Sequence, residues 1–326
     1  MALPYKQSRA QHTLLQSSPV EWRIGSENLT PALLAQHLTA PYKKEKEKVE
    51  AIFFWITDNI AYRSSYATWQ RSPLKKKISP LATLFEDSSL NQRVAYNVLQ
   101  EGYAVCDGYA RLFKTLCDYA GIKSEIITGY ARSNGYRSNT AFKSNHSWNA
   151  VYFDSAWHLL DATWASGHFT FNSPDFVKQY NGSYFLTAPS SFSFDHYPED
   201  LRWSLMERAP MMREFYHTPF KYTAYLKYKI SSFTPSKGII QASIGDTLTF
   251  ELLTPNKEKD KGIAPENNED SIDNPAIVTL MPDKQYNASN TTYSYIVPSA
   301  DVAWIQLMYN KDIIMRYRLE VVEKKE

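Results

Sequence analysis

The sequence predicts an α+β protein in which a helical and mixed N-terminal part is followed by a C-terminal β-sandwich. Apolar residues at helical spacing dominate the first hundred residues, and helix and strand patterns are mixed between residues 104 and 164. From about residue 219, short runs of β-forming residues alternate with turn residues. We therefore expect an N-terminal helical lead-in over residues 1–44, a mixed core domain over residues 45–215, and a β-sandwich domain over residues 219–326.

The composition limits the classes of protein to which the chain can belong. Its 326 residues include 36 Lys+Arg and 34 Asp+Glu, and this near balance predicts no nucleic-acid partner. Hydrophobic residues make up 43%, which is enough for a sizeable core, and no apolar run reaches the roughly 18 residues of a transmembrane segment. The first 16 residues lack the apolar stretch of a signal peptide. We expect an extracytoplasmic location only if a leader has been removed, and a cytoplasmic one otherwise.

The helical part begins at a recognisable start signal. Thr30 followed by Pro31 is typical of a helix N-terminus, because threonine caps the first turn and proline fits the first helical position. A second helix is predicted to start in the charged run Lys43–Lys48 and to end near Asn59–Ile60, since the apolar residues from Val49 onward recur at spacings of three and four. A strand is expected around Ile126–Tyr130, where the helical period ends.

Seven segments after residue 219 have the length and composition of strands. They are Tyr222–Ile230, Ile239–Ile244, Thr247–Leu253, Ala276–Met281, Thr292–Val297, Val302–Tyr309 and Ile313–Val322. Seven short strands within about 100 residues favour a small sandwich. The polar stretch Asn256–Asn274 is expected to be a long loop inside it. No cluster of chemically reactive residue types occurs in this part of the chain.

One of the two cysteines is predicted to begin a helix. The segment Gly102–Gly121 carries an apolar stripe at helical spacing, and Asp107–Gly108 suits a helix start, which places Cys106 at the N-terminal edge. Peptide dipoles favour an anion there, so the pKa of a thiol falls. Cys117 lies 11 residues further, roughly 16 Å along a helix, which is too far for a disulfide with Cys106. We expect Cys117 to be buried.

A histidine and an aspartate are predicted to share one face of a hairpin. A two-residue turn at Asp154–Ser155 makes His146 a diagonal neighbour of Asp161, whereas a turn at Phe153–Asp154 makes the two residues directly opposite. In both registers their side chains lie on the same face, since strand side chains alternate. The carboxylate can then orient the imidazole, which can accept the Cys106 proton.

The environment of this triad is less well defined. Trp148 and Trp164 flank the triad residues and are candidate substrate contacts, although walls of the core or of a groove have the same composition. One oxyanion donor is expected to be the Cys106 backbone N–H. The second stays open among four upstream side chains, which are Trp69, Gln70, Asn97 and Gln100. Neither C-x-x-C nor H-x-x-x-H spacing occurs, so we predict no metal and no cofactor.

These motifs together resemble the transglutaminase-like superfamily. The resemblance rests on residues 102–110, 145–149 and 160–164, with support from residues 54–62, and it covers roughly residues 45–205. Residues 184–187 and 196–200 resemble the branch that contains the kyphoscoliosis peptidase and related bacterial proteins. The resemblance implies a papain-like α+β fold with Cys106 as nucleophile, His146 as base and Asp161 as orienting group. Family members often have glycine directly after the last motif, where this chain has Ala165.

Acyl transfer is the chemistry that we expect from such a site. A Cys106 thiolate would attack an amide carbonyl of a protein or peptide, and water or an amine would resolve the thioester. We expect hydrolysis, as in a peptidase or amidase. The alternatives are a crosslinking transglutaminase and, in another class, a non-catalytic module that binds a protein or polymer through a vestigial triad. The substrate and the oligomeric state stay open.

Overall fold

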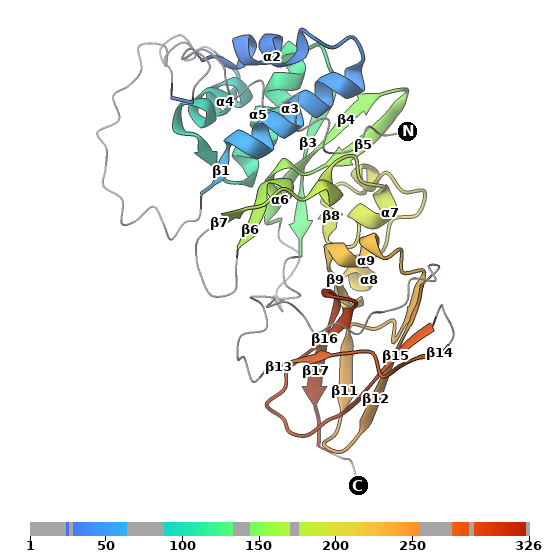
Figure 1. The fold of residues 1–326 in the computed structure, drawn as a ribbon. Coiled ribbons are helices and arrows are strands. Elements are labelled where there is room, and N and C mark those ends of the chain that lie inside the picture. Colours follow the sequence, from blue (N-terminus) through green and yellow to red (C-terminus); the bar gives the residue numbers. More distant parts are fainter. Residues whose placement is uncertain are drawn as a thin grey trace, which may run out of the picture. The chain divides into compact units, whose positions relative to one another are not determined.

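The computed structural model describes residues 24–25, 29–63, 88–132, 144–169, 176–254, 276–286 and 290–323. The chain divides into two compact units (Figure 1). The first comprises Met1–Gly129, Ser144–Pro189 and Pro198–Leu205. The second comprises Tyr130–Lys143, Ser190–Tyr197 and Met206–Glu326.

Four helices form the α-layer of the first unit, and their ends follow local sequence signals. They are α2 (Pro31–Thr39), α3 (Glu45–Asn59), α4 (Leu90–Glu101) and α5 (Cys106–Tyr119). The Thr30 hydroxyl accepts the Leu33 N–H at the start of α2, as its sequence predicts. Ser89 and Gln92 form a reciprocal capping box at the start of α4. That helix ends at Gly102, whose φ of 74° favours glycine.

The β-layer of the first unit is an antiparallel sheet in which β4 (His146–Phe153) lies between β3 (Ser124–Ala131) and β5 (Ala156–Leu160). Phe153 pairs with Ala156 across a two-residue turn, so the first of the two predicted registers is correct. Asp154 and Ser155 have φ values of 49° and 62°, which is the geometry of a type I′ hairpin turn. Helix α5 packs on β4, and their apolar side chains join the core of this unit.

Shorter elements of both units lie along the chain between these helices or between them and the strands of the second unit. A two-stranded parallel sheet pairs β1 (Ala61–Tyr62) with β2 (Tyr103–Ala104). The others are α6 (Ala162–Ser166), β6 (Gly167–Phe169), β7 (Phe176–Lys178), η3 (Gly182–Tyr184), α7 (Pro189–Phe192), β8 (His196–Pro198), η4 (Leu201–Ser204) and α8 (Met212–His217). Gly167 is required at the β6–β7 hairpin, because a Cβ atom there would lie 2.1 Å from the Val177 carbonyl oxygen.

The second unit is a β-sandwich, as predicted. One sheet has the order β10-β12-β15-β14, and the other has the order β11-β17-β16-β13 with β9 paired to β17. The strands are β9 (Phe220–Lys221), β10 (Ser232–Thr234), β11 (Ile239–Ala242), β12 (Thr247–Leu253), β13 (Ile277–Leu280), β14 (Lys284–Tyr286), β15 (Asn290–Ile296), β16 (Trp304–Tyr309) and β17 (Asp312–Val321). Phe250 and Tyr317 join the sheets, with ring centroids 4.9 Å apart. The predicted loop Asn256–Asn274 lies outside the described residues.

One predicted strand is wrong. The segment Tyr222–Ile230 contains the short helix α9 (Thr223–Lys227) instead of a strand. Its aromatic residues favour a strand locally, but Tyr225 is buried in the sandwich core and Tyr228 packs against the same core three residues later. A spacing of three places both rings on one face of a helical turn. Tertiary packing therefore outweighs the β-propensity of this segment.

Candidate active site

Cys106 is the first residue of α5, so its predicted position at a helix N-terminus is correct. Its thiol is within hydrogen-bonding reach of the His146 side chain and of the Ser147 backbone N–H. Burial raises the pKa of the Cys106 thiol, but the hydrogen bond and the charge of His146 outweigh it, and the pKa falls below its ordinary value. Cys117 is fully buried, and burial holds its pKa well above the ordinary range. The two thiols therefore differ in accessibility and in the direction in which the pKa is shifted.

His146 begins β4 and lies between the thiol and a carboxylate. Its Nε2 is 2.6 Å from Oδ2 of Asp161, so the other ring nitrogen serves the Cys106 thiol. Burial lowers the pKa of His146, but the charge of Asp161 and its hydrogen bond raise it by more. A lowered thiol pKa beside a raised imidazole pKa favours the thiolate–imidazolium pair.

Asp161 is held by the main chain as well as by the histidine. It is the N-cap residue of α6, and its Oδ1 accepts the backbone N–H groups of Thr163 and Trp164 at 2.8 and 3.0 Å. Its own N–H donates to the Tyr184 carbonyl at 2.9 Å. The side chain is fully buried. Oδ1 accepts two N–H groups of α6, and Oδ2 faces the imidazole. The orientations of the carboxylate and of the imidazole ring are therefore both fixed.

Two further groups of β4 position this site, and the sequence analysis assigned neither of them a role. The Ser147 N–H reaches the sulfur. The buried Asn149 amide donates to the Ala110 carbonyl of α5 at 3.0 Å and to the Glu125 carbonyl of β3 at 3.2 Å. Asn149 thus ties the helix that carries the thiol to the strand that carries His146. An asparagine amide can bridge two carbonyls, but the pairing partners become visible only once the strand register is known.

The two tryptophans differ in exposure. Trp148 is 1% exposed, with its ring centroid 6.1 Å from that of His146, so it forms part of the core behind the imidazole. Trp164 is half-buried, and its ring centroid lies 5.3 Å from that of His146. Trp164 is therefore the more exposed residue of this pair.

Of the four upstream oxyanion candidates, Trp69 and Gln70 lie outside the described residues. Asn97 and Gln100 both lie on α4. The Gln100 amide donates to the Leu29 carbonyl at 3.4 Å, so the Gln100 side chain lies near the start of α2. Neither Asn97 nor Gln100 is among the groups that influence the Cys106 thiol.

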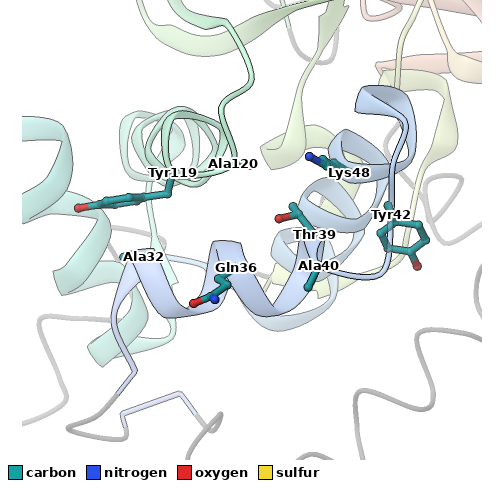
Figure 2. Close-up of a pocket in the computed structure, with 8 residues that line it drawn as sticks. All are labelled: Ala32, Gln36, Thr39, Ala40, Tyr42, Lys48, Tyr119 and Ala120. Atoms are coloured by element: carbon teal, nitrogen blue, oxygen red, sulfur yellow. The ribbon is translucent and has the colours of Figure 1, made fainter.

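A separate hollow lies at the other end of the nucleophile helix. Residues of α2, Lys48 of α3 and the α5 end at Tyr119 line it (Figure 2). Tyr119 is 13 positions after Cys106 on α5, which is roughly 20 Å along the helix. This hollow is therefore not part of the site around the thiol.

The sequence of this chain is similar to those of known proteins. Residues 32–162 match the transglutaminase-like superfamily. The human kyphoscoliosis peptidase is 29% identical over 244 residues, which cover 74% of this chain and 33% of that protein. The Drosophila melanogaster protein Hillarin is 29% identical over 209 residues, which cover 60% of this chain and 23% of that protein.

A solved structure described as a TGase is 17% identical and covers 56% of this chain and 43% of that chain, with a TM-score of 0.28, which is too low to bear on the fold. The chain spans about a third of the human protein. Within the described residues, no helix has the length and apolar character needed to cross a bilayer. From residue 32 to residue 162, the chain is therefore similar in sequence to the transglutaminase-like superfamily.

Proposed function

We propose that the chain is a cysteine-dependent acyl-transfer enzyme that acts on amide bonds of a protein or peptide, with hydrolysis as the outcome. The observation that carries the proposal is the position of His146, which bonds Asp161 through Nε2 and serves the Cys106 thiol through its other nitrogen. A binding module needs no such arrangement, whereas a thiol nucleophile does.

In the proposed reaction, the Cys106 sulfur forms a bond to the substrate carbonyl carbon, and the amide C–N bond breaks. The imidazolium of His146 gives its proton to the leaving amine, and Asp161 keeps the ring oriented throughout. Water then attacks the thioester, His146 accepts a proton from it, and the acid product leaves with the thiolate restored. The half-buried Trp164 would contact the substrate beside the imidazole.

Alkylation by iodoacetamide distinguishes a reactive Cys106 thiol from the thiol of a vestigial triad. We expect Cys106 to be alkylated at pH 6–7, where an ordinary thiol with a pKa of about 8.5 is mostly protonated. Cys117 should stay unmodified in the folded protein because it is buried. His146→Ala removes the hydrogen bond and the charge that lower the Cys106 pKa most, so the alkylation profile should move to higher pH. Equal and slow labelling of the two cysteines, measured by peptide mass spectrometry, would contradict the proposal.

The outcome of the reaction is read with casein and a fluorescent amine. Hydrolysis shortens the casein chains, whereas transamidation incorporates the label into intact chains, and mass analysis distinguishes the two. Cys106→Ser is the control for both products. Label without shortening would identify a crosslinking enzyme and would overturn the hydrolytic part of the proposal.

A further inference from the structure

The strand β1 places a tyrosine beside the residues that directly precede α5, the helix that begins at Cys106. Tyr62 pairs with Ala104 in the parallel β1–β2 sheet, and Ala104 is two residues before Cys106. Paired residues of neighbouring strands project from the same face, so Tyr62 lies beside Ala104 on one face of this small sheet.

The Cys106 side chain projects from that same face. Val105 between them is extended, with φ −89° and ψ 174°, and side chains two residues apart in an extended segment lie on one side. The distance along the strand from Ala104 to Cys106 is roughly 6.6 Å. A tyrosine side chain is of similar length, so its hydroxyl can span this step.

Ring packing places Tyr62 independently of the strand register. Its ring is stacked on Tyr109 of α5, with centroids 6.5 Å apart, and Phe176 of β7 packs against it at 5.7 Å. Tyr109 is three residues after Cys106 on the helix, and such residues are surface neighbours. The ring of Tyr62 is therefore held next to the helical turn that carries the thiol.

The electrostatics agree with this placement. Burial is the largest cause that raises the pKa of Tyr62 to about 12, and the charges of Cys106 and Asp161 add to it. At neutral pH the hydroxyl therefore keeps its proton and can act only through donation of that proton or as an acceptor from a neighbour.

We propose that Tyr62 donates its hydroxyl hydrogen bond to the oxyanion that forms when the Cys106 sulfur attacks a carbonyl, and is thus the second donor beside the Cys106 backbone N–H. In that step the carbonyl π electrons move to oxygen as the C–S bond forms, and a proton donor at this position stabilises the negative charge. The inference rests on the proposed acyl-transfer function.

The test compares two reactions of the same thiol. Acylation by p-nitrophenyl acetate passes through an oxyanion and releases p-nitrophenolate, whereas alkylation by iodoacetamide displaces iodide without one. For Tyr62→Phe we expect acylation to slow about 100-fold, as when one oxyanion donor is removed. Alkylation should stay within about twofold of the wild type. The phenylalanine ring preserves the packing on Tyr109 and Phe176, and thermal unfolding checks that the fold is kept.

Tyr103→Phe is the matched control. Tyr103 pairs with Ala61 in the same two strands, so its side chain projects from the opposite face, and both reactions should keep the wild-type rate. Wild-type acylation in Tyr62→Phe would overturn the inference while leaving the proposed function intact. An equal loss of acylation and alkylation would show that Tyr62 positions the thiol and donates to no oxyanion. If the wild type acylates no faster than Cys106→Ser, the proposed function itself fails.

Discussion

Each unit of the chain has a buried charged centre, and the two centres are built in opposite ways. In the first unit, the His146–Asp161 pair meets a thiol that is partly exposed. In the second unit, the Arg132 guanidinium donates to the main-chain carbonyls of Phe194, Phe215, Thr218 and Pro219. Arg132 is 4% exposed, and its charge is permanent.

The difference shows that burial of charge alone does not indicate chemistry. The histidine can gain or lose a proton, and its second nitrogen faces a group that a substrate can reach. The arginine can do neither, and its hydrogen bonds hold together segments that are far apart in the sequence. We therefore read the first centre as reactive and the second as structural. The predictions below test this distinction.

The largest effect is expected for Asp161→Asn. The asparagine oxygen can still accept the Thr163 and Trp164 N–H groups, because asparagine caps helices as well as aspartate does. Its NH₂ group then faces Nε2 of His146 as a donor, which forces the ring proton onto the nitrogen that faces the thiol. That tautomer cannot accept the thiol proton, and we expect p-nitrophenyl acetate acylation to fall about 10⁴-fold.

Asp118→Asn is the control for this loss, since Asp118 pairs with Lys114 on the exposed side of α5. It should acylate at the wild-type rate, and both variants should keep the wild-type circular dichroism spectrum. Full activity in Asp161→Asn would mean that the carboxylate only caps a helix, and the first centre would then be as structural as the second.

Arg132→Met should destabilise the second unit more than it affects the thiol. The substitution leaves several buried carbonyl oxygens without their donor, which costs about 3–5 kcal/mol in the free energy of unfolding. Urea denaturation followed by aromatic fluorescence measures this loss. Arg202→Met is the control, because Arg202 is 88% exposed and, among the described residues, forms an ion pair with Asp200 at the surface. An equal stability of the two variants would remove the structural role assigned to Arg132.

Asn149→Ala lies between these cases, because Asn149 is a structural residue of the reactive unit. Loss of its hydrogen bonds to the Ala110 and Glu125 carbonyls should cost about 2 kcal/mol of stability. It should also slow alkylation of Cys106 about tenfold at pH 7, because the thiol and His146 are no longer held at a fixed separation. A stability loss with an unchanged alkylation profile from pH 5 to pH 9 would show that Asn149 supports the fold alone.

Local sequence patterns were sufficient to predict much of the candidate site. The helix start at Cys106 and the shared face of His146 and Asp161 depend on spacings within one or two elements, and both were predictable. The turn at Asp154–Ser155 was one of two registers that the sequence allowed, since a hairpin with no Asn-Gly or Asp-Gly turn leaves the register open.

Contacts between distant segments could not be predicted in the same way. The Arg132 centre joins residues 62 to 87 positions apart, and nothing near Arg132 in the sequence indicates these partners. Tyr62 approaches Cys106 only because β1 pairs with β2 across 42 positions. The helix α9 forms because Tyr225 and Tyr228 pack on a core that strands elsewhere in the chain supply. In each case the deciding term is tertiary packing, which local propensity does not contain.

The smallest effect concerns Lys221, a second cation near Arg132 that can lose its charge. Its Nζ lies 3.6 Å from the ring centroid of Phe194 and 4.7 Å from that of Phe233, while burial and the charge of Arg132 lower its pKa to about 8. Between pH 8 and the ordinary lysine pKa of about 10.4, the unfolded chain binds more protons than the folded one, so stability should rise with pH in this window. Lys221→Met should abolish that rise, which we expect to be about 1 kcal/mol between about pH 8 and pH 9, or roughly 2–4 °C in Tm. Lys227→Met should not, because the hydrogen bond that Lys227 donates to Asp312 raises the pKa of Lys227 and gives the opposite sign. An unchanged rise in Lys221→Met would show that the aromatic rings keep the Lys221 ammonium charged throughout this pH window. Lys221 would then behave as Arg132 does, as a cation whose charge does not change with pH.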